Sequence, residues 1–219
     1  MIGVWAVVPV KEMDGAKQRL SALLSPDQRK KLAECMLLDV LQALSNARDV
    51  VGIILVTMDP FATKLAHDIG AHVITDGARD GHTGAVTAAS RRLVHEGVDD
   101  MLTMPGDIPR VTTEEIQAAI AAHNPMAPSF TIVPAHDEKG SNCIIMTPPD
   151  AVPLRFGDDS YFPHLDAARK FDIEPTIVRL PGIGMDIDHP EDVRAFMRMQ
   201  PPARTRTLDY LMACGVRED

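Results

Sequence analysis

The sequence has few basic residues, few cysteines and no long hydrophobic run, and each shortage excludes a class of protein. Its 219 residues carry 22 Lys and Arg against 31 Asp and Glu, a formal net charge of -9. A general nucleic-acid binder or a protein of anionic membrane surfaces needs a basic face for phosphates, so we expect neither partner. The longest apolar runs, Val4–Val10 and Val50–Val56, are far shorter than the roughly 20 residues that span a membrane.

The cysteines, Cys35, Cys143 and Cys214, are odd in number and widely spaced. The sequence has no Cys-x-x-Cys pair and no cluster of Cys with His, so we do not expect a zinc site. Reduced thiols fit a cytoplasmic protein, and the first residues lack the basic and then apolar pattern of a secretory leader. We therefore expect a cytoplasmic protein. The sequence leaves its oligomeric state open, with a homodimer among the alternatives.

The order of strand-like and helix-like segments indicates the fold class. They alternate over the first ~105 residues, which is typical of βαβ units and a parallel sheet. Two later strands, Phe130–Val133 and Cys143–Met146, flank a polar loop with no helix between them, which predicts an antiparallel hairpin. We predict an α/β fold in which residues 1–219 form a single domain with a short C-terminal helical tail at about 203–219.

Capping residues mark two helix starts. Ser25-Pro26-Asp27-Gln28 predicts an N-cap at Ser25 and a capping box closed by Gln28. Thr112-Thr113-Glu114-Glu115 predicts a second capping box. We interpret residues 11–24 as a loop of mixed charge, and Asp76–Gly84 as a Gly-rich loop that precedes a helix over Ala85–Glu96.

Cations follow the first strand. Ligands of open α/β sheets bind beyond the carboxyl ends of the strands, and the loop there carries Lys11, Lys17 and Arg19. Ammonium and guanidinium groups neutralise phosphate charge, so a polyphosphate is one candidate ligand, and a solvated loop is the alternative. With one glycine, this loop is neither a P-loop nor a dinucleotide-binding fingerprint.

Carboxylates form a second candidate site. Asp107 follows a buried strand in the segment Met104–Pro109, and Asp186 and Asp188 lie two residues apart, so they share one face of an extended chain. Mg²⁺ takes one or two such carboxylates together with phosphate oxygens. The alternatives are an Asp in an ordinary turn and, for Asp188, a cap on the helix that follows it.

Three further segments contain candidates. Gly81-His82-Thr83-Gly84 can bring backbone close to a ligand, although a lone histidine in a loop is usually solvated. The expected hairpin tip, Lys139–Cys143, and the segment Arg155–Ser160 offer groups for a substrate phosphate or carboxylate. The order of residues contains no Ser-His-Asp arrangement, metalloprotease motif or nucleophile elbow.

Five motifs recur together in one family: Val8-Pro9-Val10-Lys11 with Ala16-Lys17-Gln18-Arg19-Leu20; Pro105-Gly106-Asp107-Ile108-Pro109; Gly140-Ser141-Asn142, where that family usually has Gly-Thr-Asn; Arg155-Phe156-Gly157 with Asp159, Ser160 and His164; and Met185-Asp186-Ile187-Asp188-His189-Pro190-Glu191-Asp192. In this order they resemble the guanylyltransferases of deazaflavin coenzyme F-420 biosynthesis, which share the fold of molybdopterin nucleotidyltransferases. The resemblance runs from about residue 4 to the end of the chain.

The resemblance implies a three-layer α/β/α nucleotidyltransferase domain, Rossmann-like, whose mostly parallel sheet contains an antiparallel hairpin insertion. It implies transfer of GMP from GTP to the phosphate of 2-phospho-lactate, phosphoenolpyruvate or 3-phosphoglycerate, with release of pyrophosphate. It implies Mg²⁺ as cofactor, held by Asp107 with Asp188 and Asp186. Lys17 and Asp107 are then the catalytic candidates.

The remaining roles follow from the same resemblance. The nucleotide would contact Val8, Pro9, Lys11, Lys17, Arg19, Gly81 and Thr83, and the acceptor would contact Ser141, Asn142, Arg155 and Ser160. One departure concerns residues 81–84, where the family usually has Gly-Leu-Asn, and it leaves the base and the acceptor open. The alternatives are a sugar or molybdopterin-type transferase of the same fold and a non-catalytic nucleotide-binding protein. The loop 11–19 argues against the molybdopterin enzymes alone, because it lacks their Gly-rich signature.

Overall fold

The computed structural model describes residues 3–157, 159–200 and 204–216. Its centre is a seven-stranded sheet in the order β3-β2-β1-β4-β6-β5-β7. The strands are β1 (Val4–Val10), β2 (Val50–Thr57), β3 (His72–Ile74), β4 (Met101–Thr103), β5 (Ser129–Pro134), β6 (Ser141–Thr147) and β7 (Thr176–Ile177). Strand β6 runs antiparallel to both neighbours, and the other pairs are parallel. The predicted mostly parallel sheet with an antiparallel hairpin is therefore confirmed.

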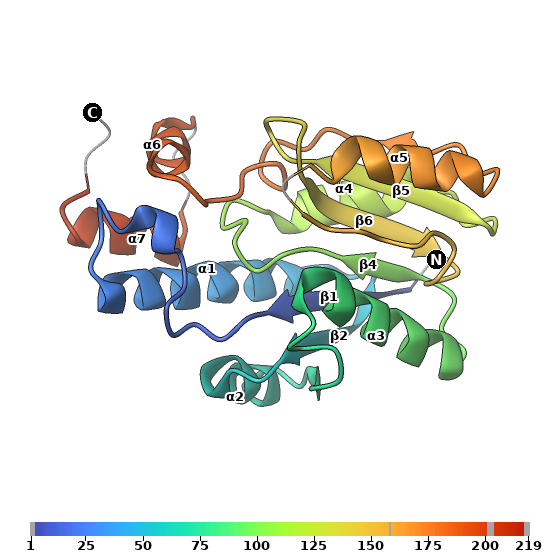
Figure 1. Cartoon of the computed structure of the whole chain (residues 1–219), viewed down its shortest axis with the longest axis horizontal. Coiled ribbons are helices and arrows are strands. Elements are labelled where there is room, and N and C mark those ends of the chain that lie inside the picture. Colours follow the sequence, from blue (N-terminus) through green and yellow to red (C-terminus); the bar gives the residue numbers. More distant parts are fainter. Residues whose placement is uncertain (1–2, 158, 201–203, 217–219) are drawn as a thin grey trace.

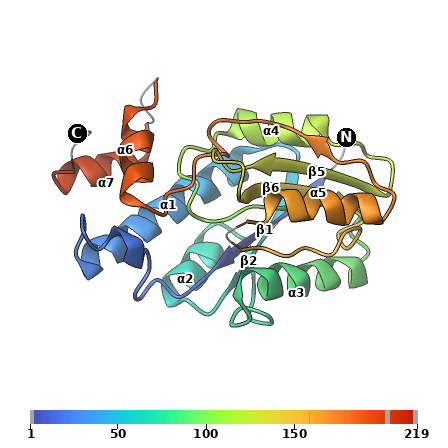
Figure 2. The same ribbon diagram turned by 45° about the horizontal axis from the view of Figure 1, so that its top comes forward.

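Helices cover both faces of the sheet (Figure 2). One face is covered by α1 (Pro26–Asn46), α2 (Pro60–Asp68) and α4 (Thr113–Ala122). The other is covered by α3 (Gly81–His95) and α5 (Tyr161–Lys170). No helix among the described residues is long and apolar enough to cross a membrane.

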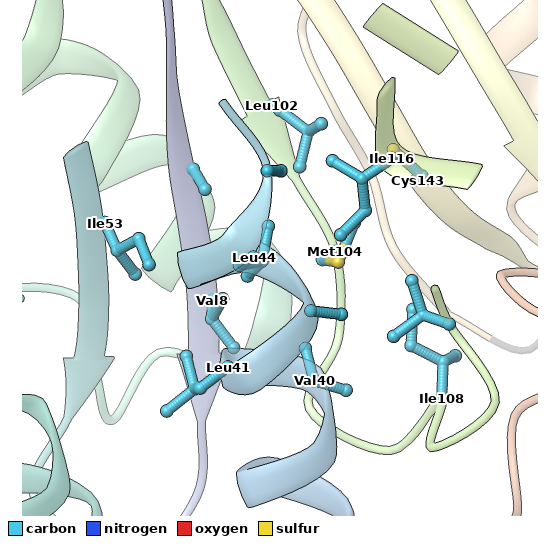
Figure 3. Close-up of a cluster of buried hydrophobic side chains, with 14 of the residues drawn as sticks. Val8, Val40, Leu41, Leu44, Ile53, Leu102, Met104, Ile108, Ile116 and Cys143 are labelled. Carbon is cyan, nitrogen blue, oxygen red and sulfur yellow. The ribbon is translucent and has the colours of Figure 1, made fainter. Parts of the chain in front are cut away.

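The longest helix packs its apolar side on the central strands. Leu41 and Leu44 of α1 lie over Val8 of β1, with Met104 and Ile116 beside them (Figure 3), and all five side chains are buried. Burying one such side chain stabilises a fold by about 1.5–3 kcal/mol, so this contact fixes α1 on the sheet. The helix begins as predicted, because both hydrogen bonds of the Ser25–Gln28 capping box form.

A further apolar cluster lies beyond one end of the sheet. It joins the N-terminal part of α1 to a 3₁₀ helix η1 (Gln18–Leu20), to α6 (Pro190–Arg198) and to α7 (Arg206–Ala213), the helix predicted in the C-terminal tail (Figure 1). Leu20, Met36, Phe196 and Leu211 are buried in its centre. The cluster therefore holds the chain immediately after Lys17, since η1 follows Lys17 directly and Leu20 is buried in the cluster.

Two loop predictions were too broad. Residues 11–24 are not wholly a loop, because Leu20 is drawn into the cluster of α6 and α7 and the chain winds into η1. The loop after β3 ends at Asp80, so Gly81–Gly84 form the first turn of α3. Glycine is a poor helix former, but a Cβ on Gly84 would collide with the Asp80 side chain, so close packing there requires the glycine.

Candidate active site

A cavity of about 710 Å³ opens at the carboxyl ends of β1 and β4. Its walls come from the loop after β1, from Pro105–Asp107 after β4, from Gly140–Asn142 at the start of β6 and from the segment before α6. Because β6 runs antiparallel, its first residues reach the same edge of the sheet as the ends of the parallel strands. The cavity thus lies where open α/β sheets bind ligands, and its size suits a small molecule.

Lys17 is one of the residues that line this cavity. Its Nζ donates to Oδ2 of Asp107 at 2.6 Å and to Oδ1 of Asp188 at 2.7 Å. Burial lowers the pKa of Lys17, but the charges of the two carboxylates outweigh this and leave its pKa above the usual value. The backbone of Lys17 is in the left-handed region, with φ 51°. The ammonium is therefore firmly charged and tied to loops that are distant in sequence.

The acidic pair two residues apart divides between two environments. Burial alone would raise the pKa of Asp188, but the Lys17 charge and hydrogen bond lower it below the usual range. The Oδ1 of Asp186 instead accepts from the Asn142 amide at 3.0 Å, and burial raises the pKa of Asp186. The alternative of Asp188 as a helix cap is wrong, because His189 is the N-cap of α6 (Pro190–Arg198) and the Asp188 carboxylate accepts from Lys17 instead.

Two serine hydroxyls that line the cavity are hydrogen-bonded to each other, and one of them to a histidine. The Oγ of Ser141 lies 2.9 Å from Nδ1 of His164 and 3.3 Å from Oγ of Ser160. Nε2 of His164 accepts the backbone N–H of Arg155 at 2.9 Å. Ser141, Ser160 and His164 are all buried, so the hydrogen bonds of these polar groups depend on one another.

The structure brings most of the predicted site residues to one cavity. Those that line it are Pro9, Lys11, Lys17, Arg19, Asp107, Ser141, Asn142, Ser160, Asp186 and Asp188. Their functional roles stay predictions, because the geometry shows only that these side chains meet.

Four predicted residues lie elsewhere. Val8 is buried in the core under α1, and Gly81 lines a hollow of about 30 Å³ next to the main cavity. The hydroxyl of Thr83 accepts the backbone N–H of Phe156 at 2.9 Å. Arg155 is not among the lining residues and meets the wall through its backbone N–H. Any effect of Val8, Thr83 or the Arg155 backbone on a ligand would pass through neighbours.

His82 is a residue that sequence reasoning misjudged. The expectation of a solvated loop histidine is wrong, because its ring stacks on Phe156 with centroids 4.0 Å apart and lines the cavity. Burial lowers its pKa to about 4, so the ring is neutral near pH 7. No local signal identifies this contact, since Phe156 lies far along the chain.

The carboxylates could hold a hard cation such as Mg²⁺ only if a bound substrate and water supplied its remaining ligands. No group of three or more His, Cys, Asp or Glu side chains that could hold a metal is found in the part of the chain that the structure describes. Mg²⁺ commonly binds through one or two carboxylates and completes its shell with water and substrate phosphates. Asp107 and Asp188, which share the Lys17 ammonium, meet that requirement.

Comparison with known proteins gives the family. A family model described as "Guanylyl transferase CofC like" matches residues 4–217. The chain is 34% identical to a phosphoenolpyruvate guanylyltransferase of Rubrobacter xylanophilus, over 88% of this chain and 92% of the relative. It is 30% identical to a 3-phospho-D-glycerate guanylyltransferase of Colwellia psychrerythraea, over 94% and 96%.

Solved structures agree on the fold. A structure from Desulfovibrio desulfuricans G20, described as a candidate nucleotide-diphospho-sugar transferase, superposes with a TM-score of 0.75 at 19% identity, over 97% of this chain and 95% of that one. A 4-diphosphocytidyl-2C-methyl-D-erythritol synthase superposes with a TM-score of 0.59 at 14% identity, over 89% and 96%. With its cavity, its sequence relatives and its fold in agreement, the chain belongs to the CofC-like guanylyl transferase family and is a nucleotidyltransferase.

Proposed function

We propose that the protein transfers the guanylyl group of GTP to the phosphate of a three-carbon phospho-acid, with release of pyrophosphate. The observation that carries the proposal is the Lys17 ammonium held between Asp107 and Asp188 at the wall of the cavity. Relatives named for phosphoenolpyruvate and for 3-phospho-D-glycerate support an acceptor of this class. As part of the proposal, the product serves deazaflavin coenzyme F-420 biosynthesis, the pathway that the sequence resemblance implies.

The reaction makes one phosphorus–oxygen bond and breaks another. An oxygen of the acceptor phosphate attacks the α-phosphorus of GTP, and the bond to the β-phosphate breaks as pyrophosphate leaves. Phosphoryl-type transfers need little covalent help and depend on alignment and charge neutralisation. Lys11, Lys17 and Arg19 line the cavity and would supply positive charge to the triphosphate and to the departing pyrophosphate.

Asp107 and Asp188, with Asp186 beside them, would hold a magnesium ion. When bound, such an ion neutralises phosphate charge and polarises phosphorus–oxygen bonds. The chain prepares these carboxylates by different means, since Asn142 orients Asp186 and Lys17 keeps Asp107 and Asp188 close together.

The acceptor would lie against Ser141, Asn142 and Ser160. These side chains line the same cavity as the cationic loop, so an acceptor bound to them would share the cavity with the triphosphate. Neutral hydroxyl and amide groups can donate to the oxygens of a phosphate or a carboxylate. The short chain of a three-carbon acid would keep both of its anionic groups within reach of these side chains.

Product analysis tests the proposal directly. The protein is incubated with Mg²⁺, mixed nucleoside triphosphates and the three phospho-acids, and the products are identified by mass spectrometry. We expect a guanylylated phospho-acid and an equal amount of pyrophosphate. The proposal fails if no acceptor gives pyrophosphate release above the level of GTP alone.

The matched variants are Asp107→Asn in the cavity and Asp68→Asn, which removes an exposed carboxylate on α2. We expect Asp107→Asn to lower turnover by about 100-fold or more, the scale of losing one electrostatic contact to a transition state, while the fold persists. Asp68→Asn should retain activity. Full activity in Asp107→Asn would contradict the role assigned to this carboxylate.

A further inference from the structure

The imidazole of His164 has a proton arrangement that its neighbours fix. The ring lies in α5 and is 1% exposed. Its Nε2 accepts the backbone N–H of Arg155 at 2.9 Å, and an imidazole nitrogen that accepts cannot carry a proton. Burial lowers the pKa of His164 to about 4, so the ring is neutral near pH 7. The single ring proton is therefore on Nδ1.

This proton determines what the Ser141 hydroxyl can do. Nδ1–H of His164 donates to Oγ of Ser141 at 2.9 Å, and the hydroxyl of Ser160 donates to the same oxygen at 3.3 Å. A hydroxyl has two acceptor positions and one donor hydrogen, so both acceptor positions of Ser141 are used. Within the described residues, no group accepts the Ser141 proton, and Ser141 lines the cavity.

We propose that His164 is a positioning residue that makes Ser141 a hydrogen-bond donor dedicated to an anionic oxygen of the acceptor substrate. This inference rests on the proposed function and adds to it the direction of one hydrogen bond, from Ser141 to the acceptor. Phosphate and carboxylate oxygens accept hydrogen bonds and fit the site, whereas a group that needs to donate finds no acceptor in Ser141. His164 acts through the serine, since it does not itself line the cavity.

The anchor of the imidazole is itself held in place. The Phe156 ring meets the His164 ring edge to face, with centroids 5.1 Å apart. It also stacks on the His82 ring. The backbone N–H of Phe156 is bound by Thr83. The Arg155 N–H that fixes the imidazole therefore belongs to a segment that Thr83 ties to α3. His82 and Thr83, which depart from the family pattern, thus lie next to the residues that we propose bind the acceptor.

Two substitutions separate the two ring nitrogens. In His164→Gln the amide oxygen can take the place of Nε2, keeping the Arg155 bond and losing donation to Ser141. In His164→Asn the amide nitrogen can take the place of Nδ1, keeping donation and losing the Arg155 bond. We expect His164→Gln to raise the KM of the acceptor about tenfold, the loss of one hydrogen bond to a charged group. We expect His164→Asn to raise it less than about threefold.

Three readouts distinguish positioning from a merely structural role. The KM of GTP and kcat should stay within about twofold in His164→Gln, because only acceptor binding is weakened. Ser141→Thr, which keeps a hydroxyl, should retain the acceptor KM. In a Ser141→Ala background, His164→Gln should cause no further loss, whereas an additional tenfold loss would overturn the proposal.

The tautomer of His164 is measured independently of turnover. Long-range ¹H–¹⁵N NMR of the wild-type protein should show the proton on Nδ1, and a proton on Nε2 would overturn the proposal even if the variants fail to fold. Failure of the proposed function looks different, since wild-type protein would then transfer no guanylyl group to any phospho-acid. That result would overturn the assignment of the ligand while the Nδ1 tautomer was still observed.

Discussion

At the scale of single residues, Lys17 has two roles, because it holds two carboxylates together and supplies a cation to the cavity. Its side chain is 11% exposed, and it is shared between Asp107 and Asp188. With a metal ion on the carboxylates, the ammonium would become available to a phosphate. Removing the ammonium would leave two neighbouring carboxylates, whose mutual repulsion favours the binding of another cation between them.

We therefore expect Lys17→Met to change metal affinity and activity in opposite directions. Mg²⁺ binding without nucleotide, measured by calorimetry, should become tighter because the competing ammonium is gone, whereas turnover should fall by about 100-fold or more. Lys30→Met is the control, because Lys30 pairs with Asp14 at a similar distance on the surface. Weaker Mg²⁺ binding in Lys17→Met would contradict this account of the lysine.

At the scale of elements, Glu115, which we expected to cap helix α4, instead contacts a segment distant in the sequence. Thr112 caps α4 as predicted, and its hydroxyl accepts from Glu115 N at 3.2 Å. The Glu115 carboxylate does not return to the cap, so the predicted second capping box is only half right. It accepts the backbone N–H of Gly182 at 2.7 Å and of Ile183 at 3.0 Å. Glu115 thus attaches the chain that leads to Asp186 to helix α4.

Glu115→Ala should accordingly destabilise the fold and loosen residues 182–188. Two N–H groups lose their acceptor, which should lower the free energy of unfolding by about 1–3 kcal/mol. Hydrogen exchange should quicken at Gly182 and Ile183. Glu114→Ala, at an exposed position in the same first turn, should cost less than about 1 kcal/mol, the contribution of the helix dipole. Equal losses in the two variants would remove the tertiary role of Glu115.

A second element contact joins α7 to α1. The buried carboxylate of Asp39 accepts from the backbone N–H of Arg206 at 3.0 Å and of Thr207 at 2.9 Å, and from the Thr207 hydroxyl at 2.7 Å. A side chain in the middle of one helix therefore satisfies donors at the start of another. Through the cluster around Leu20, the docking of α7 also supports the loop that carries Lys17.

We expect Asp39→Ala to release α7. Unfolding free energy should fall by about 2–3 kcal/mol, the cost of removing a charged hydrogen-bond acceptor, and limited trypsin digestion should cut faster at Arg206. The KM of GTP should rise because η1 loses part of its support. Asp209→Ala, an exposed residue on α7 itself, should leave the digestion rate unchanged. Digestion of Asp39→Ala at the wild-type rate would show that α7 is held by its apolar contacts alone.

Local sequence signals predicted the helices and strands. The contacts that they did not predict join residues distant in the sequence. The Ser25–Gln28 box was predictable because all its atoms lie within one helical turn. The hairpin of β5 and β6 was predictable because two buried strands flank a polar loop. The stacking of His82 depends on Phe156, and no rule of local spacing brings these residues together. The same holds for the cavity, whose candidates were predicted one by one while the Lys17 bridge required the folded chain.

At the scale of the whole molecule, two buried histidines and the partly buried His82 link stability to pH. His82 and His164 lie at the cavity, and their pKa values are lowered to about 4 by burial. His123 bonds to Thr131 and Thr147, and burial also lowers its pKa. The folded state therefore prefers these rings neutral, whereas the unfolded chain takes up protons near the ordinary pKa of 6.5.

At these histidines the unfolded state binds more protons than the folded state between about pH 4 and 6.5, so they make stability rise with pH across this window and contribute no slope above it. Each histidine with a folded pKa of about 4 contributes a slope of about 1 kcal/mol per pH unit near pH 5. Urea unfolding from pH 4.5 to 7.5 should show this rise. His164→Asn should reduce the slope by about 1 kcal/mol per pH unit, whereas His95→Asn, at an exposed position on α3, should not change it. A wild-type slope in His164→Asn would mean that burial of this ring does not oppose its protonation.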